Sequence, residues 1–221
     1  AEKLGLTGHP GSPTPMVVNA DSNKNPRLLD ELGEEQAGTY GSVTGRVSYY
    51  AQDRGDLQYV ARVLASALKN PTQQDFRRLK RAVKYLVATV HFVLLYPYQD
   101  KPSEMLAHAD ADWAGNKVTR KSISSGVVLH GKHQRESWST GQQVVALSSE
   151  ESEFYACGKA LAHVLFLPYL LRELSHHVKL RLLTDSSAAR GMMGRLGSGK
   201  VRHMQTRYLW AQERLRAKEF L

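Results

Sequence analysis

Acidic residues at three places in the second half of the sequence have the spacing of a metal-binding site. Asp110 lies in the strand-like stretch HADADWAG, Glu150, Glu151 and Glu153 open a helical stretch, and Asp185 ends the strand-like run VKLRLLTD. Carboxylates that converge repel one another unless a cation lies between them. Their hard oxygen atoms suit Mg²⁺ or Mn²⁺. Two such ions about 3.5–4 Å apart can activate a water molecule and stabilise the leaving oxygen of a phosphodiester.

Each of these acids also has a plain structural interpretation. Glu150 and Glu151 fit as first-turn acids of a helix, where the helix dipole favours negative charge, and we interpret both in this way. Asp185 could lie in the turn that precedes a helix. Asp112 shares a strand face with Asp110 and could face solvent or cap a turn. Spacing alone therefore leaves a metal site and these structural roles open.

The elements around the acids predict an α/β unit with a mixed sheet. Strand-like runs broken by Gly, Lys and Asn favour an antiparallel meander, and Ser148 or Ser149 is the expected cap of the helix that follows. Pro168 should kink or end that helix. The expected order is three strands over 106–114, 122–131 and 133–140, a helix over 150–174, a strand over 178–185, and helices over 186–196 and 202–218.

The first half of the sequence predicts a small helical segment after a linker. Residues 1–39 are rich in Gly, Pro and polar turn formers, so we expect a largely irregular linker. Residues 40–69 and 73–89 have helical apolar periodicity, with Asn70–Thr72 ending one helix and capping the next. The stretch HFVLLYPYQDKP, residues 91–102, is typical of a strand and a turn. The expected domains are the linker 1–39, the helical segment 40–100 and the α/β unit 104–221.

Composition narrows the class of partner. Cys157 is the single cysteine, which excludes an intramolecular disulfide and a zinc cluster built on several cysteines. We expect no secretion signal and no membrane contact, because no apolar run approaches the ~18–20 residues that span a bilayer. A net charge of +9 favours a polyanion such as nucleic acid, or a merely basic protein. Between Ala189 and Lys218, one acid, Glu213, accompanies eight basic residues: Arg190, Arg195, Lys200, Arg202, Arg207, Arg214, Arg216 and Lys218.

Several motifs, in order, resemble the ribonuclease H region of copia-type LTR retrotransposon Pol polyproteins. They are DADWAG, TRKSISSG, SWSTGQQVVALSSEESEFYA, LLTDSSAA and RHMQTRY. The upstream run from YGSVTG to KYLVAT is similar to the segment that connects reverse transcriptase to ribonuclease H. The resemblance implies a ribonuclease H-like mixed sheet, with three antiparallel strands and then a parallel one, flanked by helices. It also implies hydrolysis of the RNA strand of RNA–DNA hybrids.

The resemblance implies functions for individual residues. It places the catalytic, metal-binding carboxylates at Asp110, Glu153 and Asp185, which would hold two Mg²⁺ or Mn²⁺ ions. Candidate substrate contacts are Ser125, Ser186, His203, Arg202 and Arg207. Trp113 is interpreted as a core aromatic. His203 fits equally well as a structural histidine at a helix start.

The resemblance also implies partners and raises an alternative. The expected partners are an RNA–DNA hybrid and the reverse transcriptase portion of the same polyprotein, in an intracellular setting such as a cytoplasmic virus-like particle or the nucleus. Ribonuclease H chemistry draws on a fourth acid, expected beyond a final strand, and the sequence stops at AKEFL just as that strand would begin. Enzymatic activity is therefore left open. The alternatives are a remnant that binds nucleic acid without cleaving it, and a structural tether formed by residues 40–95.

Overall fold

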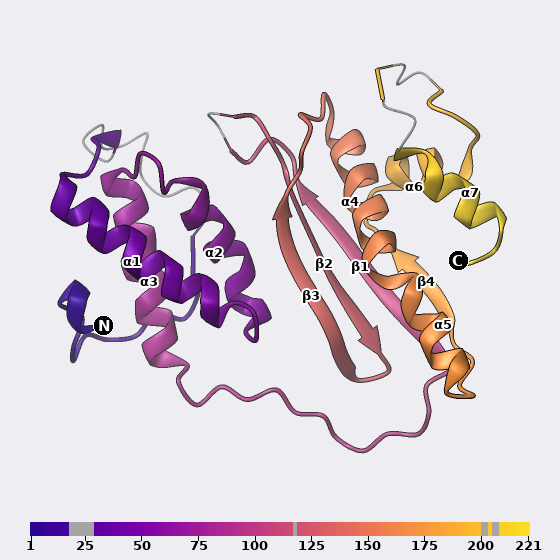
Figure 1. The fold of residues 1–221 in the computed structure, drawn as a ribbon, viewed down its shortest axis with the longest axis horizontal. Helices are drawn as coiled ribbons and strands as arrows, with labels where there is room; N and C mark the ends of the chain where they lie inside the picture. The colour runs from indigo at the N-terminus through magenta and orange to yellow at the C-terminus, as the bar shows by residue number, and fades with distance from the viewer. Residues whose placement is uncertain (18–28, 117–118, 200–202, 205–207) are drawn as a thin grey trace. The chain divides into compact units, whose positions relative to one another are not determined.

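The computed structural model describes residues 1–17, 29–116, 119–199, 203–204 and 208–221, and divides the chain into two compact units (Figure 1). Unit 1 is Ala1–Leu94 and unit 2 is Leu95–Leu221. Helices dominate the first unit, and a four-stranded sheet with helices forms the second. Each unit has a hydrophobic core of its own, so each is described separately.

Unit 1 packs three helices, α1 (Glu34–Tyr50), α2 (Gly55–Ser66) and α3 (Gln73–Ala88), around a shared apolar core. Tyr40 is fully buried, and its hydroxyl donates to the carbonyl oxygen of Leu64 at 2.7 Å, which joins α1 to α2. The start of α3 is a capping box, in which the Thr72 side chain accepts from the Asp75 N–H and the Asp75 carboxylate accepts from Thr72. The predicted cap at Thr72 is therefore confirmed, whereas α2 ends at Ser66, before the predicted stop at residues 70–72.

The expectation of an irregular segment over residues 1–39 differs from the structure at both ends of that range. Helix α1 begins at Glu34, with two acids in its first turn, so the segment ends earlier than expected. Near the N-terminus, the short 3-10 helix η1 (Glu2–Leu4) and the turn after it bury Leu4 and Leu6 in the unit 1 core. Composition predicted the turns, but it could not show that two leucines find partners on distant helices.

Unit 2 contains a mixed sheet with the strand order β3-β2-β1-β4. The strands are β1 (Glu104–Asp112), β2 (Ile123–His130), β3 (His133–Gly141) and β4 (Lys179–Leu183). β1–β2 and β2–β3 pair antiparallel, whereas β4 runs parallel to β1. The predicted ribonuclease H-like sheet, three antiparallel strands followed by a parallel one, is therefore confirmed. The backbone of Leu221 pairs with the outer edge of β4, donating to Leu180 and accepting from Leu182, both at 2.9 Å.

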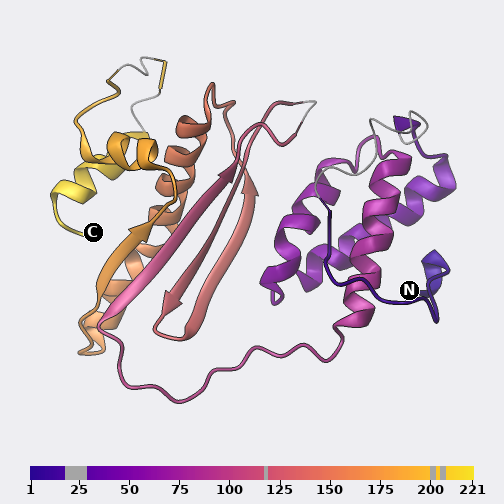
Figure 2. The same cartoon turned by 180° about the vertical axis from the view of Figure 1, so that it is seen from behind.

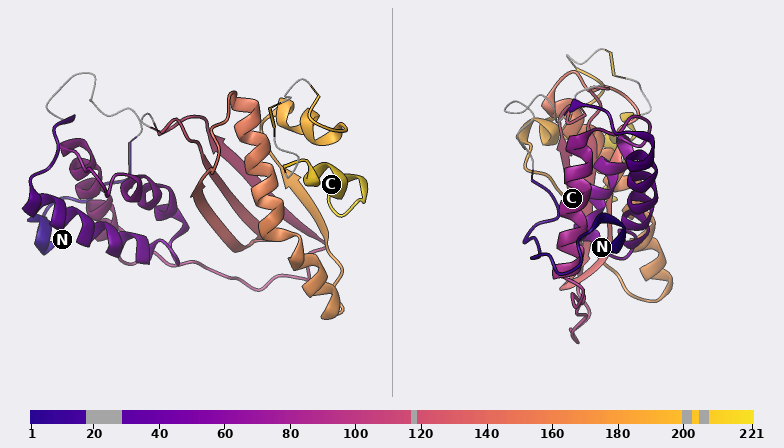
Figure 3. Two further views of the ribbon diagram at one scale, coloured as in Figure 1. Left: turned by 45° about the horizontal axis from the view of Figure 1, so that its top comes forward. Right: turned by 90° about the vertical axis from the view of Figure 1, so that its left-hand side faces the viewer.

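Helices cover the sheet and define the unit 2 core. α4 (Ser149–Val164) crosses the sheet against β1 and β2 (Figure 3), and in the view from behind the strands lie in front of it (Figure 2). Ser148 caps α4 as expected, accepting from the Glu151 N–H at 3.2 Å. The helix breaks at Leu165 and continues as α5 (Phe166–Glu173). This break agrees with the predicted effect of Pro168, because its ring excludes a hydrogen bond to Val164. The remaining helices are α6 (Ser187–Gly194) and α7 (Trp210–Arg216).

Two predictions of secondary structure need correction. Residues 92–102 form no strand, because Pro97 and Pro102 cannot donate to a ladder, and side chains attach the segment instead. Tyr96 donates to the Gln134 carbonyl at 3.1 Å, and a ring nitrogen of His133 lies 2.7 Å from the Pro97 carbonyl. The helix expected over 202–218 is regular only over α7, and residues 202 and 205–207 lie outside the described part.

The expectation that no apolar run is long enough to span a bilayer needs correction at α4 and α5. Ser149–Glu173 is long and apolar enough to cross a bilayer by length and composition alone. The stretch is apolar because α4 is a core helix, with Phe154, Leu161 and Val164 almost fully buried in unit 2. A buried core helix passes the same test, so the stretch is weak evidence for a membrane span.

Candidate metal centre

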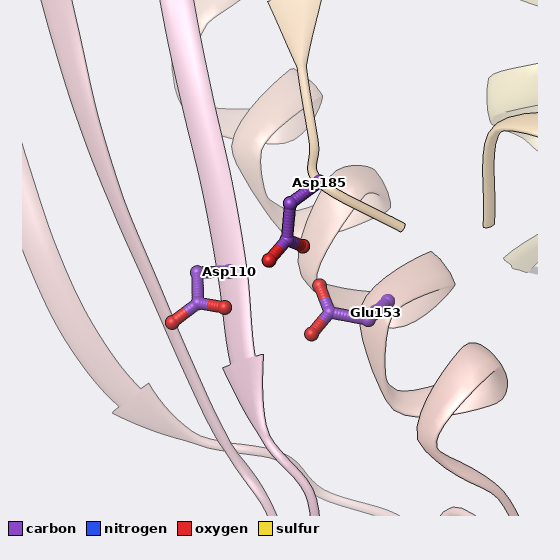
Figure 4. A group of neighbouring side chains, drawn as sticks. All are labelled: Asp110, Glu153 and Asp185. Atoms are coloured by element: carbon purple, nitrogen blue, oxygen red, sulfur yellow. The ribbon is translucent and has the colours of Figure 1, made fainter. Parts of the chain in front are cut away.

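Three elements of unit 2 bring Asp110, Glu153 and Asp185 together (Figure 4). Asp110 lies near the end of β1, Glu153 in the first turns of α4, and Asp185 just after β4. One carboxylate oxygen from each lies within 4.8 Å of the others. Because β1 and β4 run parallel, their C-terminal ends meet at one edge, and α4 begins beside that edge. Asp110 and Asp185 are exposed, whereas Glu153 is 7% exposed.

Glu153 has the surroundings of a carboxylate that lacks a counter-charge. Its Oε1 atom accepts from the Ala111 N–H at 3.2 Å, which ties α4 to β1. Its Oε2 atom is buried and has no hydrogen-bond partner among the residues that the structure describes. Burial raises the pKa of Glu153 to about 7, with the negative charges of Asp110 and Asp185 adding to the rise and the Ala111 hydrogen bond opposing it. A bound cation would remove this penalty.

The raised pKa of Glu153 predicts how stability depends on pH without metal. The pKa is about 7 in the folded chain and 4.5 in a free side chain, so the folded state binds more protons between these values. Stability should therefore be highest below about pH 4.5 and fall as pH rises through 7, as far as this group contributes. Urea unfolding in a chelator at pH 5 and pH 8 measures this change in the free energy of unfolding. In Glu153→Gln, the free energies of unfolding at pH 5 and pH 8 should differ less than in the wild type. An unchanged difference in that variant contradicts the raised pKa of Glu153.

The neighbours of Asp110 on the same strand have structural contacts. Asp112 accepts a short hydrogen bond from the Ile123 N–H, which closes the end of the β1–β2 pair. Gly115 fits beside it because a Cβ atom there would lie 2.1 Å from the Asp112 carboxylate. The expectation that Trp113 is a core aromatic was wrong, since its side chain is 49% exposed. Its indole N–H donates to the Ala146 carbonyl at 3.1 Å, which holds the ring at the surface.

The structure places two of the predicted substrate residues beside the carboxylates along the backbone. Ser125 lies opposite Asp110 in the β1–β2 register, and its hydroxyl is 3.1 Å from that of Ser139. Ser186 follows Asp185 and caps α6, accepting from the Ala189 N–H at 3.1 Å. Arg202 and Arg207 lie outside the described residues.

His203 lies against a buried acid that the sequence interpretation missed. Its Nε2 atom is 2.9 Å from Oε2 of Glu151, a residue that is 1% exposed and not an ordinary first-turn acid. Burial pushes the pKa of Glu151 upward, but hydrogen bonds from Tyr155, His203 and Leu147 outweigh it and hold the pKa below its usual value. The i, i+4 spacing of Glu151 and Tyr155 is a sequence signal for the hydrogen bond between these two side chains, but not for the contact with His203.

Sequence comparisons find several curated proteins that are similar to this chain. The chain is 27% identical over 206 residues to the Retrovirus-related Pol polyprotein from transposon TNT 1-94 of Nicotiana tabacum. It is 31% identical over 136 residues to the Retrovirus-related Pol polyprotein from transposon RE1 of Arabidopsis thaliana. It is also 32% identical to Secreted RxLR effector protein 161 of Plasmopara viticola, over 130 residues that form 58% of this chain and 90% of that protein. No family model matches the chain. No solved structure matches it.

The matches span most of this chain but only a small share of each Pol polyprotein. The tobacco match covers 90% of this chain and 15% of that polyprotein, and the RE1 match covers 61% of this chain and 9% of that polyprotein. The chain therefore spans a small part of the length of the Pol polyproteins it resembles, and their activities as whole proteins do not transfer to it automatically. Within that limit, this chain is similar to retrovirus-related Pol polyproteins from transposons.

Proposed function

We propose that unit 2 is a ribonuclease H domain that hydrolyses the RNA strand of RNA–DNA hybrids by two-metal catalysis. The observation that carries this proposal is the convergence of Asp110, Glu153 and Asp185, with ligand oxygens within 4.8 Å, at one edge of a ribonuclease H-like sheet. The similarity to retrovirus-related Pol polyproteins from transposons supports it. Copia-type Pol polyproteins come from transposons, and the motifs of this chain resemble their ribonuclease H region.

The carboxylate cluster fits Mg²⁺ or Mn²⁺. All three groups offer hard oxygen atoms, which these ions prefer. Within the described part of the chain, the buried Oε2 atom of Glu153 has no hydrogen-bond partner, and a buried unpaired carboxylate oxygen is costly unless a cation meets it. Asp110, Glu153 and Asp185 would hold the ions. When bound, two ions supply an activated water molecule and stabilise the leaving oxygen of the phosphodiester.

Other side chains of unit 2 would bind and orient the hybrid. Ser125 and Ser186 lie next to the carboxylates in the chain or the register, where hydroxyl groups can meet a sugar or phosphate. Contacts to the 2′-hydroxyl would select the RNA strand. The basic residues after Ala189, Arg202 and Arg207 among them, would add salt-dependent affinity without sequence preference. His203, which is held by Glu151, is the remaining candidate contact.

A cleavage assay with the full chain tests the proposal. A hybrid with labelled RNA and labelled DNA strands is incubated with the protein and Mg²⁺. We expect cuts in the RNA strand that leave 5′-phosphate ends, while the DNA strand and a matched DNA duplex stay intact. Equal cleavage of DNA, or RNA cleavage that persists in excess chelator, contradicts the proposal.

The second candidate is a remnant that keeps the fold and binds nucleic acid without cleaving it. The cluster found among the described residues holds three carboxylates, and ribonuclease H chemistry draws on a fourth. Salt-dependent binding of the hybrid without cleavage would favour this candidate. The absence of both binding and cleavage would favour the structural tether, in which residues 40–95 position unit 2 against the reverse transcriptase portion of the polyprotein. An intracellular site of action is part of the leading proposal.

A further inference from the structure

Two histidines from distant segments of unit 2 direct ring nitrogens at each other, away from the carboxylate cluster. His130 ends β2, and His176 lies in the turn between α5 and β4. Their Nε2 atoms are 3.3 Å apart, and their ring centroids are 5.3 Å apart. Both side chains are partly buried. His130 pairs with Met105 on β1, five residues before Asp110, which places the pair about 16 Å along the strand from that carboxylate.

The spacing of the two rings is that of ligands around one metal ion. At a Zn–N distance of about 2.0–2.1 Å and a tetrahedral angle, two imidazole nitrogens lie about 3.4 Å apart and the ring centres about 5.2 Å apart. The observed 3.3 Å and 5.3 Å agree with both values. At 3.3 Å the two Nε2 atoms also lie within hydrogen-bond distance, so one ring can donate to the other when no ion is bound.

The hydrogen bonding of His130 also suits a metal ligand. His130 hydrogen-bonds the backbone of Pro102, and because proline has no N–H the partner is its carbonyl oxygen. Since Nε2 faces His176, this bond is left to Nδ1. A ligand histidine typically donates its other N–H to a carbonyl in this way, which keeps the Nε2 lone pair free. Burial lowers the pKa of His130 against the opposing effect of the Pro102 hydrogen bond, and the positive charges of His176, Arg135 and His133 lower it further.

The backbone holds both histidines in place before any ion binds. Ser175 adopts a left-handed conformation with φ 57°, which ends α5, and the His176 N–H donates to the Leu171 carbonyl at 2.9 Å. On the other side, Gln99 donates to the His130 carbonyl at 2.9 Å and accepts from the Lys132 N–H at 2.8 Å. The two rings are therefore positioned by separate turns, which lowers the entropic cost of binding an ion between them.

We propose that His130 and His176 form a binding site for a divalent transition metal ion of the class that imidazole prefers, with Zn²⁺ as its representative. The ion would join the β2–β3 turn to the α5–β4 turn, with water completing its coordination. Imidazole ligands favour Zn²⁺, Cu²⁺ and Ni²⁺ over Mg²⁺, so this site and the carboxylate cluster would select different ions. The proposal does not depend on ribonuclease activity.

Calorimetric titration of the full chain with Zn²⁺, in excess Mg²⁺, tests the site. We expect one Zn²⁺ per chain and a rise in the unfolding temperature, because an ion that binds only the folded state stabilises it. His176→Gln should weaken the affinity at least about tenfold, since even groups outside the ligand set cost about 10–100-fold. His177→Gln is the matched control, because His177 is the exposed neighbour in the same turn, and it should bind Zn²⁺ as the wild type does.

Two results would overturn the assignment. One is Zn²⁺ binding that His176→Gln leaves unchanged. The other is Zn²⁺ binding that Asp110→Asn removes, which would move the ion to the carboxylates. If His176→Gln fails to fold, imidazole NMR of the wild type decides, because the Nε2 resonances of His130 and His176 must shift together at one equivalent of Zn²⁺. Separate or absent shifts contradict the site.

Discussion

Asp110→Asn is expected to reduce Mg²⁺-dependent cleavage of hybrid RNA by at least about a hundredfold, because even partners outside a metal's ligand set often cost about 10–100-fold. Asp110 supplies one of three oxygens within 4.8 Å, and an amide binds Mg²⁺ less well than a carboxylate. Asp185→Asn should have a comparable effect. The measurement is the initial rate of RNA cleavage at saturating hybrid.

The same substitution should stabilise the protein when metal is absent. Asp110 adds to the raised pKa of Glu153, so removing its charge relieves repulsion inside the cluster. The unfolding temperature in chelator should therefore rise at pH 8, while the stabilisation that Mg²⁺ confers on the wild type should disappear. Loss of activity together with a gain in metal-free stability distinguishes a ligand from a residue that merely supports the fold.

Asp112→Asn is the matched control for this experiment. Asp112 lies two residues along the same strand, and its Oδ1 atom accepts from the Ile123 N–H, a bond that an asparagine oxygen can also accept. Cleavage by this variant should stay close to the wild-type rate. Activity that survives in Asp110→Asn and Asp185→Asn would remove the carboxylate cluster from the mechanism.

Gly126→Ala is expected to destabilise unit 2 by about 3 kcal/mol, at the upper end of what overpacking commonly costs. Gly126 lies in β2 between Ala109 and Trp138 on the neighbouring strands. A Cβ atom there would lie 2.1 Å from the Trp138 ring and 2.7 Å from the His108 carbonyl oxygen. The tryptophan cannot retreat freely, because its other face stacks on His163 with ring centroids 4.6 Å apart. Urea unfolding followed by near-UV circular dichroism measures the change.

Gly158→Ala provides the control for an added methyl group. Gly158 lies within α4, and a Cβ atom there meets nothing within 4 Å. Alanine in a helix interior is favoured over glycine by about 0.5–1 kcal/mol, so this variant should be slightly more stable than the wild type. If Gly126→Ala unfolds at the wild-type urea concentration, the close packing of Trp138 over β2 is contradicted.

Local patterns were sufficient for most elements of the fold. The three strand-like runs, the Ser148 cap and the break near Pro168 depend on neighbouring residues, so they could be predicted from short stretches. The wrong strand over residues 91–102 shows the limit of this reasoning. Its composition favours a strand, but a strand requires a partner edge, and two prolines remove donors from this one. Whether a partner exists is a property of the tertiary structure.

By itself, the sequence determined which side chains are available and, through the family motifs, which acids were the candidates for metal binding. The tertiary structure decided which of them converge, because parallel pairing of β1 and β4 brings Asp110 and Asp185 to one edge and the start of α4 adds Glu153. It also separated Glu151 from this cluster and placed it against His203, and it set His130 opposite His176. These contacts join residues 46 or 52 positions apart, and local spacing cannot encode a distance across such separations.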